Sequence, residues 1–158
     1  MTVVIADTGP INYLLQIDAI GLLPALFGTI HVPMEVVGEL NHPLAPAPVR
    51  KWIGAPPPWL TIARVPPPQA DFLPRLDLGD RAANALAEQL GARLIVMDDR
   101  AGVTAAAARN LPAVGTLGVL FRAADRGMID LPTAILRLKA TNFRVRPEIL
   151  DKLLRDRS

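Results

Sequence analysis

Cysteine is absent from this 158-residue chain, so the sequence excludes a disulfide framework and any metal site held by thiolates. The absence also suits a reducing compartment. No apolar run approaches the ~20 residues that a membrane-spanning helix needs, and the first residues lack the basic and apolar regions of a secretory leader. We therefore expect a soluble, cytoplasmic protein with no membrane partner.

Net charge is also small, at +2, but it is unevenly distributed. Residues 137–157 carry seven basic and three acidic side chains, whereas residues 1–136 carry ten and twelve. Most of the basic residues are arginine, which favours bidentate contacts with phosphate, although the apolar spacing of the last segment also fits ordinary helix packing. A hydrophobic content of 51% fits one globular domain over residues 1–158. Nucleic-acid binding is permitted by this composition and not demonstrated by it.

Two short apolar runs each end on carboxylates. Residues 3–6 (VVIA) lead into Asp7, and residues 94–97 (LIVM) lead into Asp98 and Asp99. Apolar runs of this length between polar residues are typical of buried parallel strands. Because ligand sites of open α/β sheets lie just beyond the carboxyl ends of the strands, we expect the three acids to face one crevice.

The rest of the chain alternates between strand and helix patterns, which predicts an α/β fold whose parallel sheet is covered by helices on both faces. Two short helices are predicted after the first strand, and another begins at Pro33 with Met34, Val37 and Leu40 on one face. Ten of the sixteen prolines lie between Pro43 and Pro74, which disfavours long elements there. Further strands are predicted at 29–32, 60–63 and 113–114, and further helices at 49–53, 78–90, 101–110, 116–126, 132–140 and 147–156.

Two further acids, Glu39 and Asp80, lie on helices that border the same predicted edge. If all five acids converge, their mutual repulsion raises some of their pKa values unless a cation neutralises them. Carboxylates without histidine or cysteine favour Mg²⁺ or Mn²⁺ over zinc. Such an ion lowers the pKa of a bound water and screens charge on a phosphate, which indicates phosphodiester hydrolysis.

Each acid also has a purely local interpretation. Asp7 and either Asp98 or Asp99 fit helix N-caps, Asp80 fits the first turn of a helix through the helix dipole, and Glu39 fits a solvated helix surface. The set of acids is therefore more informative than any one of them.

Five segments, in this order, are similar to a known family: VIADTGP at 4–10, VPMEVVGEL at 32–40, LDLGD at 76–80, VMDDR at 96–100 and GTLGVL at 115–120. Together they resemble the PIN-domain ribonucleases and, within them, the VapC-like toxins of prokaryotic toxin–antitoxin pairs. The resemblance covers essentially the whole chain. No single segment is specific, but the order of the five is.

The resemblance implies a PIN-like three-layer α/β/α fold with a central parallel sheet. It also implies a Mg²⁺ or Mn²⁺ site built from Asp7, Glu39, Asp80 and Asp98, with Asp99 beside them, and cleavage of single-stranded or structured RNA. A toxin of this kind has an antitoxin protein as its partner.

The chain departs from the family pattern at two positions. Asp80 stands where glutamate is common, and its shorter side chain is expected to reach a metal through a water. Val103 follows Gly102 where the family often has arginine, so one polar contact near the site is expected to be missing.

Three polar residues beside the acids are candidates for substrate binding. Thr8 and Thr116 fit the orientation of a water or a phosphate, and they also fit helix caps. Arg100 fits a contact with substrate phosphate or a pair with Asp98 or Asp99. The two histidines are expected to be bystanders.

A homodimer is expected from the family resemblance and from the proline-rich segment, which contains Trp52 and Trp59. These rings fit either base stacking or a protein interface, and interfaces are the commoner setting for surface aromatics.

Other functions fit less of the sequence. Asp7-Thr8-Gly9 after apolar residues is also the signature of aspartic proteases, but those enzymes are rich in β-structure and here a helix is predicted to follow. Phosphoaspartyl phosphatases need a second aspartate where Gly9 stands, and receiver domains need an acidic pair and a late lysine that are absent. A PIN-like scaffold that binds protein or RNA without catalysis ranks second, because no acid has been lost.

Overall fold

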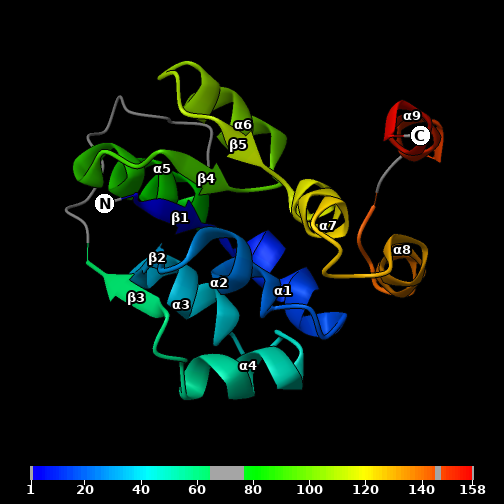
Figure 1. The fold of residues 1–158 in the computed structure, drawn as a ribbon. Helices are drawn as coiled ribbons and strands as arrows, with labels where there is room; N and C mark the ends of the chain where they lie inside the picture. Colours follow the sequence, from blue (N-terminus) through cyan, green and yellow to red (C-terminus); the bar gives the residue numbers. More distant parts are fainter. Residues whose placement is uncertain (1, 65–76, 145–146, 158) are drawn as a thin grey trace.

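A five-stranded sheet forms the centre of the computed structural model, which describes residues 2–64, 77–144 and 147–157. The strand order is β3-β2-β1-β4-β5, and all neighbouring strands are parallel, as predicted (Figure 1). In the centre, Val4 aligns with Ile30 on one side and with Leu94 on the other. The strands are β1 (Val4–Ala6), β2 (Ile30–Pro33), β3 (Leu60–Ala63), β4 (Leu94–Val96) and β5 (Ala113–Val114).

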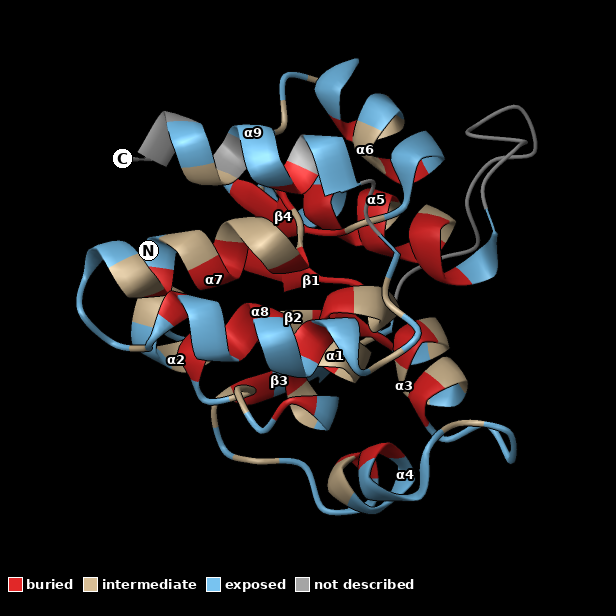
Figure 2. Ribbon diagram, turned by 90° about the vertical axis from the view of Figure 1, so that its right-hand side faces the viewer, coloured by how far each residue is buried: buried red, intermediate tan, exposed pale blue. Residues whose placement is uncertain are grey.

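Alternate strand residues face two different layers of helices, because successive side chains of a strand point to opposite faces. Val4 and Val96 join the larger apolar cluster, which includes residues of α1 (Thr8–Gln16), α2 (Leu22–Phe27) and α7 (Thr116–Asp125). Ile5, Ile95 and Met97 join a second cluster with residues of α5 (Leu78–Leu90) and α6 (Arg100–Ala107). Figure 2 shows the buried strands between these helices. The predicted three-layer α/β/α fold is confirmed.

The short helix α3 (Met34–Leu40) bridges the two helical layers, because it contacts both α1 and α5. It follows β2 directly and therefore lies at the edge where the strands end. The remaining described helices are α4 (Ala47–Gly54), α8 (Leu131–Lys139) and α9 (Pro147–Arg157). Helices α8 and α9 lie beyond α7 in Figure 1.

Within the proline-rich segment, the predicted helix and strand are present as α4 and β3. The rings of Trp52 and Trp59 lie 5.8 Å apart, and both pack partly buried against the larger apolar cluster. Residues 65–74 of this segment and the adjoining residues 75–76 lie outside the described residues, as does Arg146 of the basic tail, residues 137–157. No helix in the described part of the chain is both long enough and apolar enough to span a membrane.

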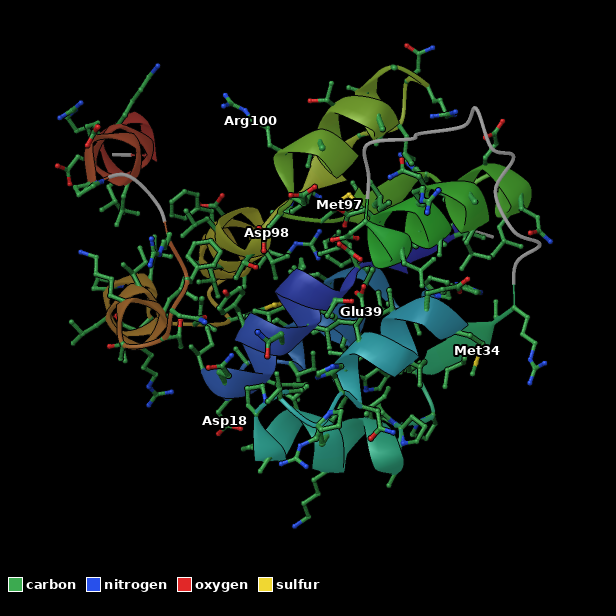
Figure 3. All side chains as sticks on the ribbon, turned by 180° about the vertical axis from the view of Figure 1, so that it is seen from behind. Asp18, Met34, Glu39, Met97, Asp98 and Arg100 are labelled. Carbon is green, nitrogen blue, oxygen red and sulfur yellow. The ribbon has the colours of Figure 1, made fainter. Side chains whose placement is uncertain are left out.

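Two local predictions are wrong. Met34 is 40% exposed and points outward in Figure 3, whereas Val36 is fully buried with Leu40, because α3 packs between two layers instead of against one. Helix α6 ends at Ala107 and does not reach residue 110, because Asn110 adopts a positive φ of 60° that ends the helical turn.

Candidate active site

The carboxyl ends of β1, β4 and β5 meet at one edge of the sheet, and polar residues follow each strand there. The Asp7 N–H donates to Val96 O at 2.9 Å, so the bonding between β1 and β4 continues past the strand. Asp98 follows β4 after Met97, and Thr116 begins α7 just beyond β5. A cavity of about 520 Å³ opens at this edge, and all five acids predicted from the sequence line it.

Asp7 and Asp80 form the buried centre of this edge, with exposed fractions of 5% and 3%. One carboxyl oxygen of each, Asp7 Oδ1 and Asp80 Oδ2, is buried without a hydrogen-bond partner among the described residues. Burial raises the pKa of Asp7, although its contact with Asp80 opposes the rise. Burial and the neighbouring Asp7 and Asp99 carboxyls raise the pKa of Asp80 to about 10. Without a cation, both carboxyls of the pair are therefore shifted toward their protonated forms.

Asp80 is held in place by the first turn of α5. Its N–H donates to Asp77 Oδ1 at 2.9 Å, so Asp77 is the N-cap and Asp80 lies inside the helix. Asp77 also lines the cavity and was not predicted as a site residue. The sequence carried a signal for it, since an aspartate three residues before Asp80 is the usual position for a capping side chain.

Glu39 extends from α3 to both neighbouring helices. Its Oε1 accepts a bond from the Thr8 hydroxyl of α1, and its Oε2 accepts from the Gly79 N–H of α5 at 3.2 Å. A Cβ atom at residue 79 would overlap the Glu39 carboxylate, so only glycine allows this approach. Burial raises the pKa of Glu39 and nearby Asp7 adds to the rise, while the Thr8 bond opposes it.

Asp98 is fixed by the start of α7. Its Oδ1 accepts from the Thr116 N–H at 2.7 Å, and its Oδ2 accepts from the Thr116 hydroxyl at 2.5 Å. A Cβ at Gly115 would lie 2.6 Å from Asp98 Oδ1, so a side chain there would displace the carboxylate. Burial raises the pKa of Asp98, and the Thr116 bonds oppose the rise. The Thr8 and Thr116 hydroxyls thus bond to carboxylates, and neither residue is a helix cap.

Asp99 and Arg100 begin α6 on the solvent side of the cavity. Asp99 is the exposed N-cap of α6 and accepts from the Gly102 N–H at 3.3 Å, so the local interpretation holds for this acid. Its carboxyl lies beside Asp80 because buried Asn84 of α5 donates to Gly102 O at 3.4 Å and ties the two helices together. Figure 3 shows Asp98 and Glu39 near the centre of the edge, with Arg100 directed away from them. Arg100 lines the cavity and forms no ion pair among the described residues.

Tyr13 and Phe143, which also line the cavity, were not predicted from the sequence, and Arg144 was noted there only as one of the basic residues of 137–157. Tyr13 comes from α1, and Phe143 and Arg144 come from the segment after α8. Burial raises the pKa of Tyr13, nearby Asp98 adds to the rise, and Arg144 opposes it. Nothing in the sequence near Phe143 indicated this position, because it reaches the site only through the packing of α8.

The donors at this edge fit a hard divalent cation. All are oxygens, two of them buried and unpartnered, and no basic side chain pairs with these acids in the described part of the chain. Among the described residues, no group of three or more acidic or histidine side chains is already arranged to hold a metal ion. That arrangement still suits Mg²⁺, which keeps several waters and takes only one or two carboxylates from the protein. Asp7 and Asp80 are the pair that fits this requirement.

Comparison with known proteins supports one assignment. A family model described as a PIN domain matches residues 3–158. No curated protein and no solved structure matches the chain significantly. Because the match covers nearly the full sequence, and the parallel sheet with its acidic edge agrees with the predicted fold, the chain belongs to the PIN-domain family.

Proposed function

We propose that this protein is a metal-dependent endoribonuclease that hydrolyses RNA phosphodiester bonds. PIN domains are generally nucleases and generally use divalent metals. The observation that carries the proposal is the buried Asp7–Asp80 pair, which has two unpartnered oxygens at the carboxyl edge of the sheet and lines an open cavity. Buried carboxylates of this kind need a proton or a cation, and Mg²⁺ or Mn²⁺ meets that need with oxygen ligands.

In this proposal the catalytic carboxylates have two kinds of task. Asp7 and Asp80 hold the cation, with Asp99 beside them for an outer contact through water. Glu39 and Asp98, which are fixed by Thr8, Gly79 and Thr116, orient waters and the attacking oxygen. When bound, the metal lowers the pKa of a water and screens charge that develops on the phosphate. Arg100, at the cavity, is suited to a flanking phosphate.

The finer assignments rest on the resemblance described above. We propose that the chain acts as one domain in the cytoplasm, as the toxin of a toxin–antitoxin pair whose partner is a small antitoxin protein. We also propose that two copies form a homodimer. The basic tail and the arginine content suit an RNA substrate.

We expect the Asp7→Asn variant to lose Mg²⁺-dependent cleavage of RNA by at least about 100-fold while it keeps its fold, because the amide has the shape of the carboxyl but loses its charge. Cleavage of labelled RNA measures the loss, and circular dichroism checks the fold. Asp18→Asn is the matched control, since Asp18 lies far from the acids (Figure 3) and asparagine tolerates its positive φ of 60°. Cleavage undiminished by Asp7→Asn would exclude the proposed site.

As a test of the toxin role, expression of the wild type should arrest bacterial growth, and expression of Asp7→Asn should not.

Metal-free protein should lose stability as the pH rises. A carboxyl whose pKa is raised by folding binds more protons in the native state. Its contribution to the free energy of unfolding is therefore complete below about pH 4 and is lost as the pH rises to the folded pKa. For Asp80 that window extends to about pH 10. At pH 8, Mg²⁺ at a hundred times its Kd should raise the free energy of unfolding by about 2.7 kcal/mol and the melting temperature by roughly 5–10 °C. Thermal unfolding with EDTA or Mg²⁺ measures both effects. Equal melting temperatures at pH 8 with and without Mg²⁺ would contradict metal binding here.

Thr116→Val should reduce cleavage by about 10-fold, because valine removes the hydroxyl donor that fixes Asp98 while preserving the volume of the buried side chain. Thr133→Val is the matched control: Thr133 also donates its hydroxyl and its N–H to one aspartate, Asp130, but on α8. Cleavage rates of folded protein should therefore fall in the first variant and not in the second. An equal effect of the two substitutions would remove Thr116 from the site.

Light scattering at micromolar concentration should give twice the 17.0 kDa mass of the chain. A measured mass of one chain at micromolar concentration would contradict the proposed homodimer.

A further inference from the structure

The cavity at the acidic edge has a second side that the proposed metal chemistry does not use. Tyr13, Phe143 and Arg144 line it together with the acids. Both rings are only partly buried, so each keeps some surface open to the cavity. A cavity with carboxylates, two aromatic rings and a guanidinium group has the components that bind a phosphate, a base and a neighbouring phosphate of one strand.

The two rings are held in place from independent parts of the chain. Tyr13 lies on α1, the helix that starts immediately after Asp7, and its backbone oxygen accepts from Ile17 N–H at 3.1 Å. Phe143 N–H donates to Thr141 Oγ1 at 3.1 Å, and the same hydroxyl donates to Leu138 O at 2.6 Å. The turn after α8 therefore fixes the backbone from which the Phe143 ring extends.

The rings meet edge to face, with centroids 5.0 Å apart and planes at 82°. In this geometry one ring presents its edge to the face of the other, so the pair is stabilised without covering all four ring faces. Arg144 follows Phe143 directly, is exposed, and forms no ion pair among the described residues. Its guanidinium group is thus available beside the rings.

We propose that Tyr13 and Phe143 form a subsite that stacks an unpaired base of single-stranded RNA next to the scissile phosphate, with Arg144 contacting a neighbouring phosphate. The inference rests on the proposed ribonuclease function and narrows its substrate. Bases in a duplex have both faces covered by their neighbours, so stacking on protein rings selects a strand whose bases are free. Ring faces accept every base, so the subsite favours single strands over duplexes more than one sequence over another.

RNA affinity is measured after removal of a base, after removal of a ring, and after removal of both. Short single-stranded RNAs, in which one base at a time is replaced by an abasic residue, are bound to protein in an Asp7→Asn background that keeps them intact, and fluorescence anisotropy gives Kd with Mg²⁺ present. One abasic position should weaken binding by about 10-fold. In Phe143→Leu and Tyr13→Leu, the Kd of intact RNA should rise by about 10-fold. In these variants the same abasic position should raise Kd further by less than about 2-fold.

Three control variants separate stacking from packing. Tyr13→Phe keeps the ring and should keep the abasic penalty in full. Phe27→Leu removes a partly buried ring that does not line this cavity, and it should leave the penalty unchanged. Arg144→Gln should weaken binding of intact and abasic RNA by the same factor, because its contact is to phosphate.

Two results would overturn the subsite: an abasic penalty that persists in full in both leucine variants, or RNA whose binding is insensitive to every abasic position. Cleavage by the wild-type protein is measured in parallel on the same oligonucleotides. Cleavage without any base dependence would exclude the subsite alone. Base-dependent binding that is lost in the leucine variants, with no cleavage by the wild type, would support the subsite and exclude the ribonuclease function.

Discussion

Repulsion between two buried carboxyl groups is the constraint on which the rest of the site depends. Asp7 and Asp80 are almost completely withdrawn from water, and no basic side chain pairs with either among the described residues. Such a pair opposes folding whenever both groups are ionised. The elements that bear them are held by apolar packing: Ile5 of β1 and Leu86 of α5 belong to one buried cluster, and each buried side chain of this size contributes about 1.5–3 kcal/mol. The core therefore holds together two groups that would separate on their own.

The other two central acids, unlike this pair, have hydrogen-bond donors at both carboxyl oxygens. Glu39 and Asp98 each accept hydrogen bonds from a threonine hydroxyl and from a backbone N–H. These donors favour the ionised form and leave little freedom of movement, and the close approach of Gly79 and Gly115 restricts it further. The edge thus contains a buried pair of acids that each have one carboxyl oxygen without a hydrogen-bond donor among the described residues, flanked by two acids whose hydrogen bonds offset part of the rise in pKa that burial causes. In the proposed function, the first pair holds the cation and the two flanking acids keep a fixed orientation beside it.

Much of this arrangement could be predicted from the sequence, because strands that end on acids, and helices with clear apolar spacing, are local signals. The parallel sheet and the convergence of the five acids on one cavity follow from such signals. What could not be predicted depends on contacts between distant segments. Met34 was assigned to the wrong face because α3 packs between two layers, and Phe143 reaches the site only through the docking of α8. The role of the Thr8 hydroxyl was equally hidden, since its partner, Glu39, lies 31 residues away.

The charges that line the cavity set the order in which its parts can act. Asp7, Glu39, Asp77, Asp80, Asp98 and Asp99 supply six carboxyl groups, and Arg100 and Arg144 supply two guanidinium groups. An anionic strand is therefore repelled from the acidic side until a cation or protons reduce its charge. The proposed subsite of Tyr13, Phe143 and Arg144 includes a guanidinium group, which attracts phosphate and offsets part of this repulsion. The surroundings of Asp7-Thr8-Gly9 also argue against an aspartic protease. The segment leads into a helix at the end of a parallel sheet. Its aspartate is one of six acids that line the cavity, whereas an aspartic protease uses a pair of aspartates.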